Sequence, residues 1–424
     1  MSRSHPRVVA LLSWGDRFED FHDKLGISLD DLHGRFTGTW LFNHVDALRT
    51  ADVATVLYFV SARVDEPMRL VHEPSGAGVC VLPAPWTHRK LQAARDRFRW
   101  RSATFASVRS YVATPWRSLV REMRRDGCGA IVCQEYEYPR FDEAVAVGRL
   151  AGLPVFATYQ GGASPGSGLE VPFRRSAIRR AAGLIAGSSA ELDRVRTTYG
   201  VPEEQLAMIP NAIDVDRWRA IDRGTARAEL GIADEVDVAV WHGRVEIESK
   251  GLDVLVDAWR RLVPPTPTER PRLLMVVGSG QDREAFRRLI GTVPAQAIRW
   301  EDRWVYEPDD VIRYLSAGDI AIRPSRREGF AVSLVEAMAC GLPVVATGVS
   351  GVAEAFGAEG AGVTVPPEDP AAIVDAVERL FADRAARTAL GDAARARTEA
   401  VFSLTSVGGE LRSFMEARGA FRGP

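Results

Sequence analysis

Residues 323–347 decide the fold of this chain, and they read RPSRREGFAVSLVEAMACGLPVVAT. An apolar run ends just before this stretch, a loop carries Glu328, and a helix is expected to begin near Val332. Gly341 is a sound stop for that helix, because glycine adopts the left-handed backbone with which many helices end. The next strand is Val344–Thr347. The stretch therefore predicts one βαβ unit of a parallel sheet.

Two carboxylates flank the expected start of the helix. Glu328 lies on the loop and Glu336 about one turn into the helix, so the pair can face one cavity from two directions. A carboxylate accepts two hydrogen bonds, which suits the vicinal hydroxyls of a ribose. The amides of Ala331–Leu334 lie between them at the helix N-terminus, where open α/β sheets bind ligands and the helix dipole favours phosphate.

The same alternation of apolar runs and helical segments continues along the whole chain and predicts parallel sheets. The first series of expected strands is Val8–Leu12, Ala54–Val60, Ala130–Cys133, Pro154–Thr158, Gly183–Ala186 and Ala207–Ile209. The second series is Val238–Trp241, Arg272–Val277, Ala297–Trp300, Ile320–Ile322 and Val344–Thr347. Two series in 424 residues predict two doubly wound α/β domains. We expect domains at 1–208 and 209–390 and a helical tail at 391–424.

The composition is that of a soluble globular protein, with a formal net charge of −2. The segment from Trp86 to Arg125 departs from this balance, since it holds eleven Lys and Arg against two acidic residues. Such an imbalance concerns partners rather than fold. The four cysteines form no metal or disulfide pattern, and the apolar run near the N-terminus is too short for a signal peptide. We therefore expect a cytoplasmic protein.

Residues 323–347 resemble the Glu-x7-Glu signature of retaining GT-B glycosyltransferases, above all of glycosyltransferase family 4. The resemblance rests on Pro-Ser-x-x-Glu-Gly-Phe and on Glu-Ala-Met-Ala-x-Gly-Leu-Pro-Val-Val-Ala-Thr around the two acids. It implies that Glu328 contacts the transferred sugar and Glu336 the nucleotide ribose. The residues after the first acid are implied to hold the sugar and the distal phosphate, and they are Gly329, Phe330, Ala331, Val332, Ser333 and Leu334.

A second element agrees with that resemblance. The strand Val238–Trp241 leads into a Gly243-Arg244 pair and then Lys250-Gly251, which resembles the family's Gly-Arg…Lys-Gly turn. The resemblance implies that Arg244 and Lys250 clamp the donor diphosphate beside Gly243. Two fixed cations can stabilise the charge of a diphosphate leaving group without a metal ion. We expect His242 to be structural.

Further positions carry weaker signals. Gly278-Ser-Gly280 follows a strand, but the third glycine of a dinucleotide fingerprint is absent, which argues against NAD. In the family this turn lies near the donor. The resemblance also implies that Arg303 to Val305 lie in the segment that reads the nucleotide base. Gly38, before an expected helix at 39–50, resembles a glycine that approaches the donor phosphates. Asp214 and Asp216 match a metal-binding Asp-x-Asp by letters only.

One position departs from the family pattern. Family members usually carry a His where this chain has Gln160, and that His is thought to contact the transferred sugar. Glutamine can hydrogen-bond a sugar hydroxyl but cannot act as a base. The substitution leaves open a catalytically idle, donor-binding subunit. A nucleotide-sugar 2-epimerase of the same fold is a further alternative, although such enzymes lack this Glu-x7-Glu pattern.

The resemblance implies a GT-B fold, with two facing Rossmann-like domains, an interdomain cleft and a C-terminal helix that crosses back to the N-terminal domain. It implies a retaining hexosyltransferase that takes a UDP- or GDP-sugar and a hydroxyl acceptor, lipid-linked or a glycan or small glycoside, with no cofactor and no divalent metal. The basic segment from Trp86 to Arg125 fits an anionic membrane surface, a phosphorylated acceptor or a solvated helix face. Nucleic acid is not expected, because no binding module is recognisable. Because the basic segment fits an anionic membrane, a peripheral location on the inner face of the cell membrane is a further expectation.

Overall fold

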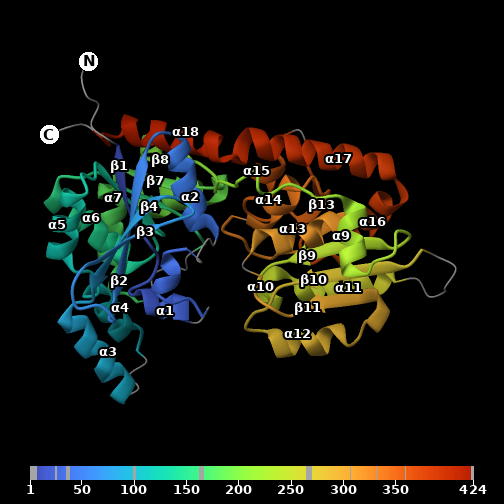
Figure 1. The fold of residues 1–424 in the computed structure, drawn as a ribbon, viewed down its shortest axis with the longest axis horizontal. Helices are drawn as coiled ribbons and strands as arrows, with labels where there is room; N and C mark the ends of the chain where they lie inside the picture. The colour runs from blue at the N-terminus through green and yellow to red at the C-terminus, as the bar shows by residue number, and fades with distance from the viewer. Residues whose placement is uncertain are drawn as a thin grey trace. The chain divides into compact units, whose positions relative to one another are not determined.

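The computed structural model describes residues 7–23, 26–34, 39–98, 102–161, 167–263, 270–305, 307–330, 332–358 and 360–421. The chain forms two compact units (Figure 1). Unit 1 comprises Met1–Pro210 together with Leu404–Pro424, and unit 2 comprises Asn211–Ser403. The observed boundary after Pro210 lies two residues beyond the expected domain end at residue 208. Each unit is a sheet covered by helices, as alternating β and α segments require.

Unit 1 is built on an eight-stranded sheet in the order β3-β4-β2-β1-β5-β6-β7-β8, with only the β3–β4 pair antiparallel among its described strands. The strands are β1 Val8–Leu12, β2 Ala54–Ser61, β3 Met68–His72, β4 Ala77–Pro83, β5 Ala130–Gln134, β6 Val155–Thr158, β7 Gly183–Ala186 and β8 Leu206–Met208. Central strands such as β1 and β5 are buried along their whole length, which explains their continuous apolar sequences.

Helices cover both faces of this sheet. They are α1 Phe18–His22, α2 Thr39–Thr50, α3 Trp86–Phe98, α4 Ala103–Tyr111, α5 Trp116–Arg125, α6 Pro139–Ala151, α7 Glu170–Arg180, α8 Ser189–Tyr199 and α18 Leu404–Ala417, with 3-10 turns η2 Asp30–Leu32 and η3 Glu203–Gln205. Helices α5, α6 and α7 bury their apolar faces in one core cluster with β1 and β5. Helix α18 packs against α2, where a Cβ on Gly408 would lie 1.9 Å from the carbonyl oxygen of Ala47. Its Phe414 ring also lies 5.9 Å from that of Phe156.

Unit 2 is built on a six-stranded parallel sheet in the order β11-β10-β9-β12-β13-β14. Its strands are β9 Asp237–His242, β10 Arg272–Val277, β11 Ile298–Glu301, β12 Ile320–Arg323, β13 Val344–Thr347 and β14 Val363–Val365. Its helices are α9 Arg223–Leu230, α10 Ile247–Lys250, α11 Leu252–Leu262, α12 Arg283–Ile290, α13 Pro308–Ala317, α14 Val332–Ala339, α15 Val352–Phe356, α16 Pro370–Ala382 and α17 Arg384–Arg397, with the 3-10 turn η4 Ala295–Ala297 and the π-helical turn η5 Thr398–Phe402.

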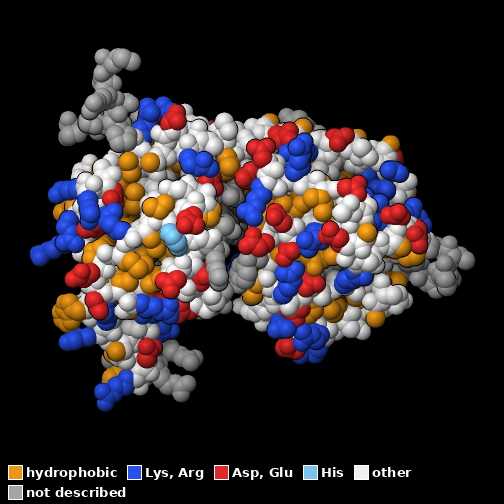
Figure 2. Space-filling model, viewed as in Figure 1, with side chains coloured by type: hydrophobic (Ala, Val, Ile, Leu, Met, Phe, Trp, Pro, Cys, Tyr) orange, Lys and Arg blue, Asp and Glu red, His pale blue; other side chains and the backbone are white. Residues whose placement is uncertain are grey.

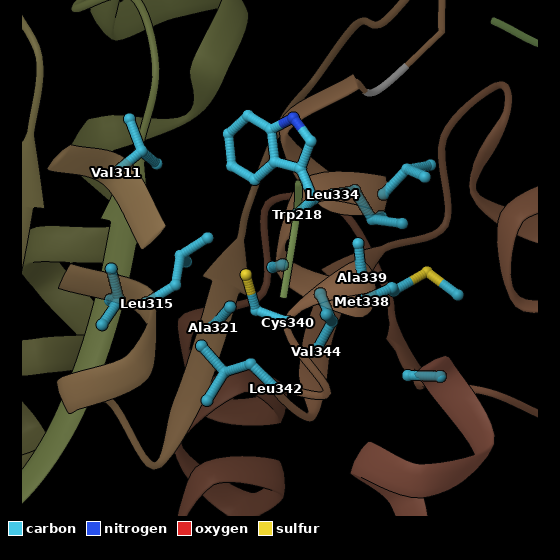
Figure 3. Packing of buried hydrophobic residues seen from close by; sticks show 14 of the residues in the cluster. Trp218, Val311, Leu315, Ala321, Leu334, Met338, Ala339, Cys340, Leu342 and Val344 are labelled. Atoms are coloured by element: carbon cyan, nitrogen blue, oxygen red, sulfur yellow. The ribbon is translucent and has the colours of Figure 1, made fainter. Parts of the chain in front are cut away.

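Two apolar clusters hold the helices of unit 2 on its sheet. One joins α13, α14 and η5 to β9, β12 and β13, and Figure 3 shows Leu334 and Met338 of α14 packed among residues of the neighbouring elements. The other joins α11 and α16 to the opposite face of the same strands. Helix α14 is thus fixed by its buried side, and its first turn lies at the carboxyl edge of β12, as predicted from residues 323–347.

The described strands match the predicted series closely. Each predicted strand lies within one residue of an observed one at both ends. Three strands escaped prediction: β3, β4 and β14. Strand β3 is a half-exposed edge strand with an arginine at its second position, and β14 has only three residues, so neither carries the long apolar run of a buried parallel strand.

The expected tail boundary at residue 391 is too early. Residues 391–403 remain with unit 2, and the chain passes to unit 1 only at Leu404. Arg395 explains this, since its guanidinium donates to the carbonyl oxygens of Val215 and Ala339 at 2.8 and 2.5 Å. The Phe402 ring also lies 5.8 Å from that of Phe330.

Candidate functional site

The carboxyl edge of the unit 2 sheet gathers the loops that carry most of the predicted site residues. Strands β10, β9 and β12 are neighbours in the sheet, so the loops that follow them leave it side by side. These loops are residues 278–282, 243–246 and 324–330. This is the edge at which parallel α/β sheets bind ligands.

The glycines of the first two loops allow their backbones to touch. Gly278 has a φ of +132°, and a Cβ there would lie 2.0 Å from the carbonyl oxygen of Gly243. A Cβ on Gly280 would lie 2.2 Å from the carbonyl oxygen of Val245. Glycine is thus required at 278 and 280 by the packing of the two loops. The predicted contact of these glycines with a donor stays a prediction.

Lys250 and Glu328 form the centre of the site. The Lys250 Nζ donates to both carboxylate oxygens of Glu328, at 2.9 and 2.8 Å, and the Ser325 hydroxyl donates to one of them at 2.7 Å. The lysine side chain is 19% exposed and the glutamate side chain 10%, so the pair is largely removed from water. Two predicted residues are therefore in direct contact, although the sequence assigned them to different parts of the donor.

The loop of Glu328 is tied to the turn that carries Lys250. The amides of Arg326 and Arg327 donate to the Ser249 carbonyl oxygen at 2.9 and 3.3 Å. Gly251 has a φ of +61°, and a Cβ there would lie 2.0 Å from the carbonyl oxygen of Pro324. The Arg326 guanidinium adds ion pairs with two carboxylates, those of Asp253 and Glu368. These contacts hold both loops in one arrangement.

Arg244 differs from Lys250 in its surroundings. Its side chain is 57% exposed, and its Nε lies 3.0 Å from an oxygen of Glu246. The described contacts therefore leave Arg244 at the surface of the unit, where a long side chain can reorient toward an anion. The structure does not bring it against Glu328.

The first turn of α14 supplies backbone donors beside the two acids. Its early N–H groups have no intrahelical partner. That of Val332 already donates to the Phe330 carbonyl oxygen at 2.9 Å, which leaves those of Ser333 and Leu334. Leu334 is fully buried and Phe330 is 9% exposed, so both side chains belong to the core and only their backbone can meet a ligand. Val332 and Ser333 are half-buried, and Ala331 lies outside the described residues. Gly329 precedes this turn on the loop.

Glu336 is held by a chain of hydrogen bonds that the sequence did not reveal. The His242 Nε2 lies 2.8 Å from an oxygen of Glu336, and the other ring nitrogen, Nδ1, contacts the Arg323 guanidinium. Arg323 also donates to the Ser333 carbonyl oxygen at 3.1 Å. The one available signal was a cation at the last position of an otherwise apolar strand.

Burial shifts the pKa of both basic partners. Burial and the adjacent Arg323 charge lower the pKa of His242 to about 4, against the opposing effect of Glu336. Burial lowers the pKa of Arg323 to about 10, partly offset by Glu336 and Glu328. Near pH 7 the imidazole is therefore neutral and the guanidinium charged.

The remaining predicted positions of unit 2 have structural partners. Arg303 follows β11 and is bound to Glu301 and Asp310 at 2.9 and 3.1 Å, and Val305 packs against the apolar cluster of α14. The first acid of the Asp-x-Asp letters, Asp214, accepts backbone N–H groups two and three residues later, which is the role of a turn residue.

In unit 1, Gln160 follows β6 at the carboxyl edge of its sheet. Its amide N–H donates to a Glu135 oxygen at 3.2 Å, and its side chain donates to the Thr158 hydroxyl at 3.2 Å. On the neighbouring strand, the Gln134 side chain is buried and neither of its amide atoms has a partner among the described residues. The predicted Gly38 lies outside the described residues.

Two family models match the chain. A model described as Glycosyltransferase Family 4 matches residues 71–217, and one described as Glycosyl transferases group 1 matches residues 236–383. The chain belongs to glycosyltransferase family 4. The two matches fall on unit 1 and unit 2 respectively, so both halves of the chain carry the family pattern.

Curated relatives of this family member include a D-inositol 3-phosphate glycosyltransferase of Saccharomonospora viridis, 29% identical over 63% of the chain and 63% of the relative. Another is a GDP-mannose-dependent monoacylated alpha-(1-6)-phosphatidylinositol monomannoside mannosyltransferase of Corynebacterium glutamicum, 30% identical over 54% and 61%. The chain thus matches less than two thirds of the length of these curated relatives.

Solved structures support the GT-B fold of the family 4 chain over nearly its whole length. Sucrose-phosphate synthase of Thermosynechococcus elongatus has a TM-score of 0.69 at 21% identity, covering 97% of this chain and 98% of its own. Anabaena HepE in complex with UDP has a TM-score of 0.70 at 16% identity, covering 97% and 100%. No helix among the described residues is long and apolar enough to cross a membrane.

Proposed function

We propose that this family 4 member is a retaining hexosyltransferase, which moves a sugar from a UDP- or GDP-sugar to a hydroxyl acceptor. The observation that carries the proposal is the contact of Lys250 with Glu328, beside Glu336 and the first turn of α14. Cation, backbone donors and two carboxylates at one sheet edge suit a ligand that joins a diphosphate to two polyhydroxyl groups.

In the proposed mechanism the bond between the anomeric carbon and the distal phosphate oxygen breaks, and its electron pair leaves on that oxygen. The cations of Lys250 and Arg244 and the amides of Ser333 and Leu334 stabilise the developing charge. The acceptor oxygen attacks from the face that the phosphate leaves, so the anomeric configuration is kept. Its proton passes to the leaving phosphate oxygen. Glu328 positions the sugar.

We further propose that transfer needs no divalent metal, because two side-chain cations and a helix N-terminus supply the positive charge. Transfer should then persist in excess EDTA. It should fall by about 10²-fold or more in a double Arg244→Ala, Lys250→Ala variant, because donors aimed at a leaving group are commonly worth this much each. Loss of transfer in EDTA would contradict this part of the proposal.

The acceptor is proposed to bind unit 1. The curated relatives named above act on an inositol phosphate and on a phosphatidylinositol mannoside, so these two acceptor classes come first in a screen. The donor is identified beforehand, by testing UDP-, GDP- and dTDP-sugars for protection against thermal unfolding. Incubation of that donor without acceptor separates transfer from epimerisation, because only an epimerase would convert the sugar.

The central experiment compares Glu328→Ala with a matched surface variant. The control is Glu284→Ala on α12. It removes the same type of side chain from a position where that side chain is 69% exposed. We expect transfer to be lost in the first variant and retained in the second. Equal activity of the two variants would sink the proposal, and wild-type donor binding without transfer to any acceptor would favour the idle subunit.

We propose that the protein is cytoplasmic and docks on an anionic membrane through α3 and α5. Trp86 and Phe98 of α3 are 67% and 57% exposed, and Figure 2 shows Lys and Arg side chains gathered over α5. Not all of the basic segment is available, since Arg89 is bound to the carbonyl oxygens of Ala84 and Val64. Sedimentation with vesicles of phosphatidylcholine, with and without phosphatidylglycerol, should show binding only to the anionic vesicles, weakened by salt.

A further inference from the structure

Arg323, His242 and Glu336 form a hydrogen-bonded chain behind the proposed ribose contact. The order of donors in this chain is fixed by chemistry. A guanidinium only donates, so the Nδ1 of His242 that contacts Arg323 must accept, and the ring proton must lie on Nε2. Nε2–H then donates to Glu336 Oε2 at 2.8 Å. The other carboxylate oxygen, Oε1, accepts no hydrogen bond from the described residues.

The charged groups that face His242 come from two elements, Arg323 of β12 and Glu336 of α14. Glu328 acts on Arg323 from the loop between them. The Cys340 thiol, one turn beyond Glu336, stays neutral because burial raises its pKa to about 12. A second proton on His242 would place an N–H against the guanidinium, so the chain excludes the imidazolium form.

The arrangement is a costly one for stability alone. Arg323 is 3% exposed and its Nε has no hydrogen-bond partner among the described residues. A buried cation with an unsatisfied donor stabilises a fold less than a well-packed apolar side chain of similar size would. Arg323 ends strand β12 and is linked through His242 to Glu336, which is the proposed ribose contact. This position indicates that Arg323 has a role in the site.

We propose that Arg323 and His242 are positioning residues, which hold Glu336 aimed with Oε1 available to the nucleotide ribose. Arg323 acts through His242 by occupying Nδ1, and His242 acts through Glu336 by anchoring Oε2. This inference rests on the proposed donor site. It extends that site to two residues which do not themselves touch the donor.

Removing Arg323 should turn His242 into a titratable group. In Arg323→Met the Nδ1 atom has lost its donor and the neighbouring positive charge, so the pKa of His242 rises from about 4. On acidification the imidazolium then forms an ion pair with Glu336, and the carboxylate becomes a weaker acceptor for ribose hydroxyls. Donor binding should become pH-dependent in a range in which the wild type is insensitive.

The test measures the Kd of UDP and GDP between pH 5.5 and 8.5, using whichever nucleotide protects the wild-type chain. Loss of a hydrogen bond to a charged group weakens binding by about tenfold or more, so His242→Phe should bind at least that much more weakly. His242→Gln retains a donor and an acceptor and should bind within about threefold of wild type. Arg323→Met should match the wild type at pH 8.5 and weaken toward pH 5.5, whereas Arg323→Met combined with His242→Gln should show no such trend.

A second readout does not require the nucleotide. The chain has seven histidines, so the His242 ring signal can be assigned by its loss in His242→Gln and followed by NMR. We expect no titration above pH 5 in the wild type and a higher midpoint in Arg323→Met. An unchanged midpoint, or wild-type affinity in His242→Phe, would overturn the inference. Failure of UDP and GDP to bind the wild type would instead overturn the proposed function.

Discussion

Replacing Lys250 by methionine should reveal how strongly the site depends on its central ion pair. Methionine retains the length of the side chain but not its charge. Glu328 would then keep only the Ser325 hydroxyl as a donor, at 2.7 Å, in surroundings that leave 10% of its side chain exposed. A carboxylate so placed is short of partners, because two of its three hydrogen bonds came from the lysine.

The magnitude follows from that geometry. Removing one partner of a fully buried pair costs about 3–5 kcal/mol, and a hydrogen bond to a charged group contributes about 1.5–3 kcal/mol. Because 19% of the lysine side chain is exposed, we expect the lower end, about 2–3 kcal/mol of the unfolding free energy of unit 2. The double variant Lys250→Met, Glu328→Gln should recover most of the loss, since no uncompensated charge remains.

The assay is a double-mutant cycle on the full chain, with hydrogen exchange of unit 2 peptides as the measure of unfolding free energy. A matched control joins the same two loops. Arg327 and Glu248 form an ion pair at 3.1 Å with side chains 73% and 85% exposed, for which we expect a coupling energy below about 0.5 kcal/mol. A coupling for Lys250 and Glu328 no larger than that of the control would refute the reasoning.

Three further changes test other parts of the structure. Glu143 is a buried carboxyl whose pKa is raised by burial to about 8 from its ordinary 4.5, so the folded chain binds a proton that the unfolded chain releases. Stability should therefore fall by up to about 1.4 kcal/mol per pH unit from about pH 4.5 to 8 and then level off, and Glu143→Gln should remove this part of the slope in thermal melts. Gly251→Ala should lower the melting temperature and donor affinity together, because its Cβ would strike Pro324, whereas Gly409→Ala, with open space around it, should be neutral or stabilising. Arg326→Ala should weaken donor binding and leave the melting temperature of the free chain nearly unchanged, since the arginine joins the two loops of the site. A lower melting temperature with wild-type donor affinity would contradict this.

The fold was open to prediction because buried parallel strands leave a continuous apolar run in the sequence. Strands such as β1 and β10 were predicted to the residue on that basis. The same reasoning failed for β3, whose alternating exposure leaves Arg69 within the strand, where it forms ion pairs with carboxylates of α5 and the following turn. It also failed for the tail, since nothing local marks Arg395 as a ligand for three backbone carbonyl groups of unit 2.

The site was predictable to the extent that its chemistry is local in sequence. Glu328 and Glu336 share one loop and helix, and Lys250 belongs to a short recognisable turn. The contacts that hold these groups join residues 78 to 94 positions apart, such as Lys250 with Glu328 and His242 with Glu336, and sequence spacing carries no such information. The contacts of His242 with Arg323 and Glu336 could not be inferred on this basis.

The passage of the chain from unit 2 back to α18 has a consequence for biosynthesis. Most of unit 1 is synthesised before unit 2, but α18, which covers α2 and Phe156, is synthesised after it. Unit 2 is continuous, and all of it emerges before α18 does. A nascent chain can therefore complete unit 2 first, while α2 and Phe156 of unit 1 stay uncovered until α18 has emerged.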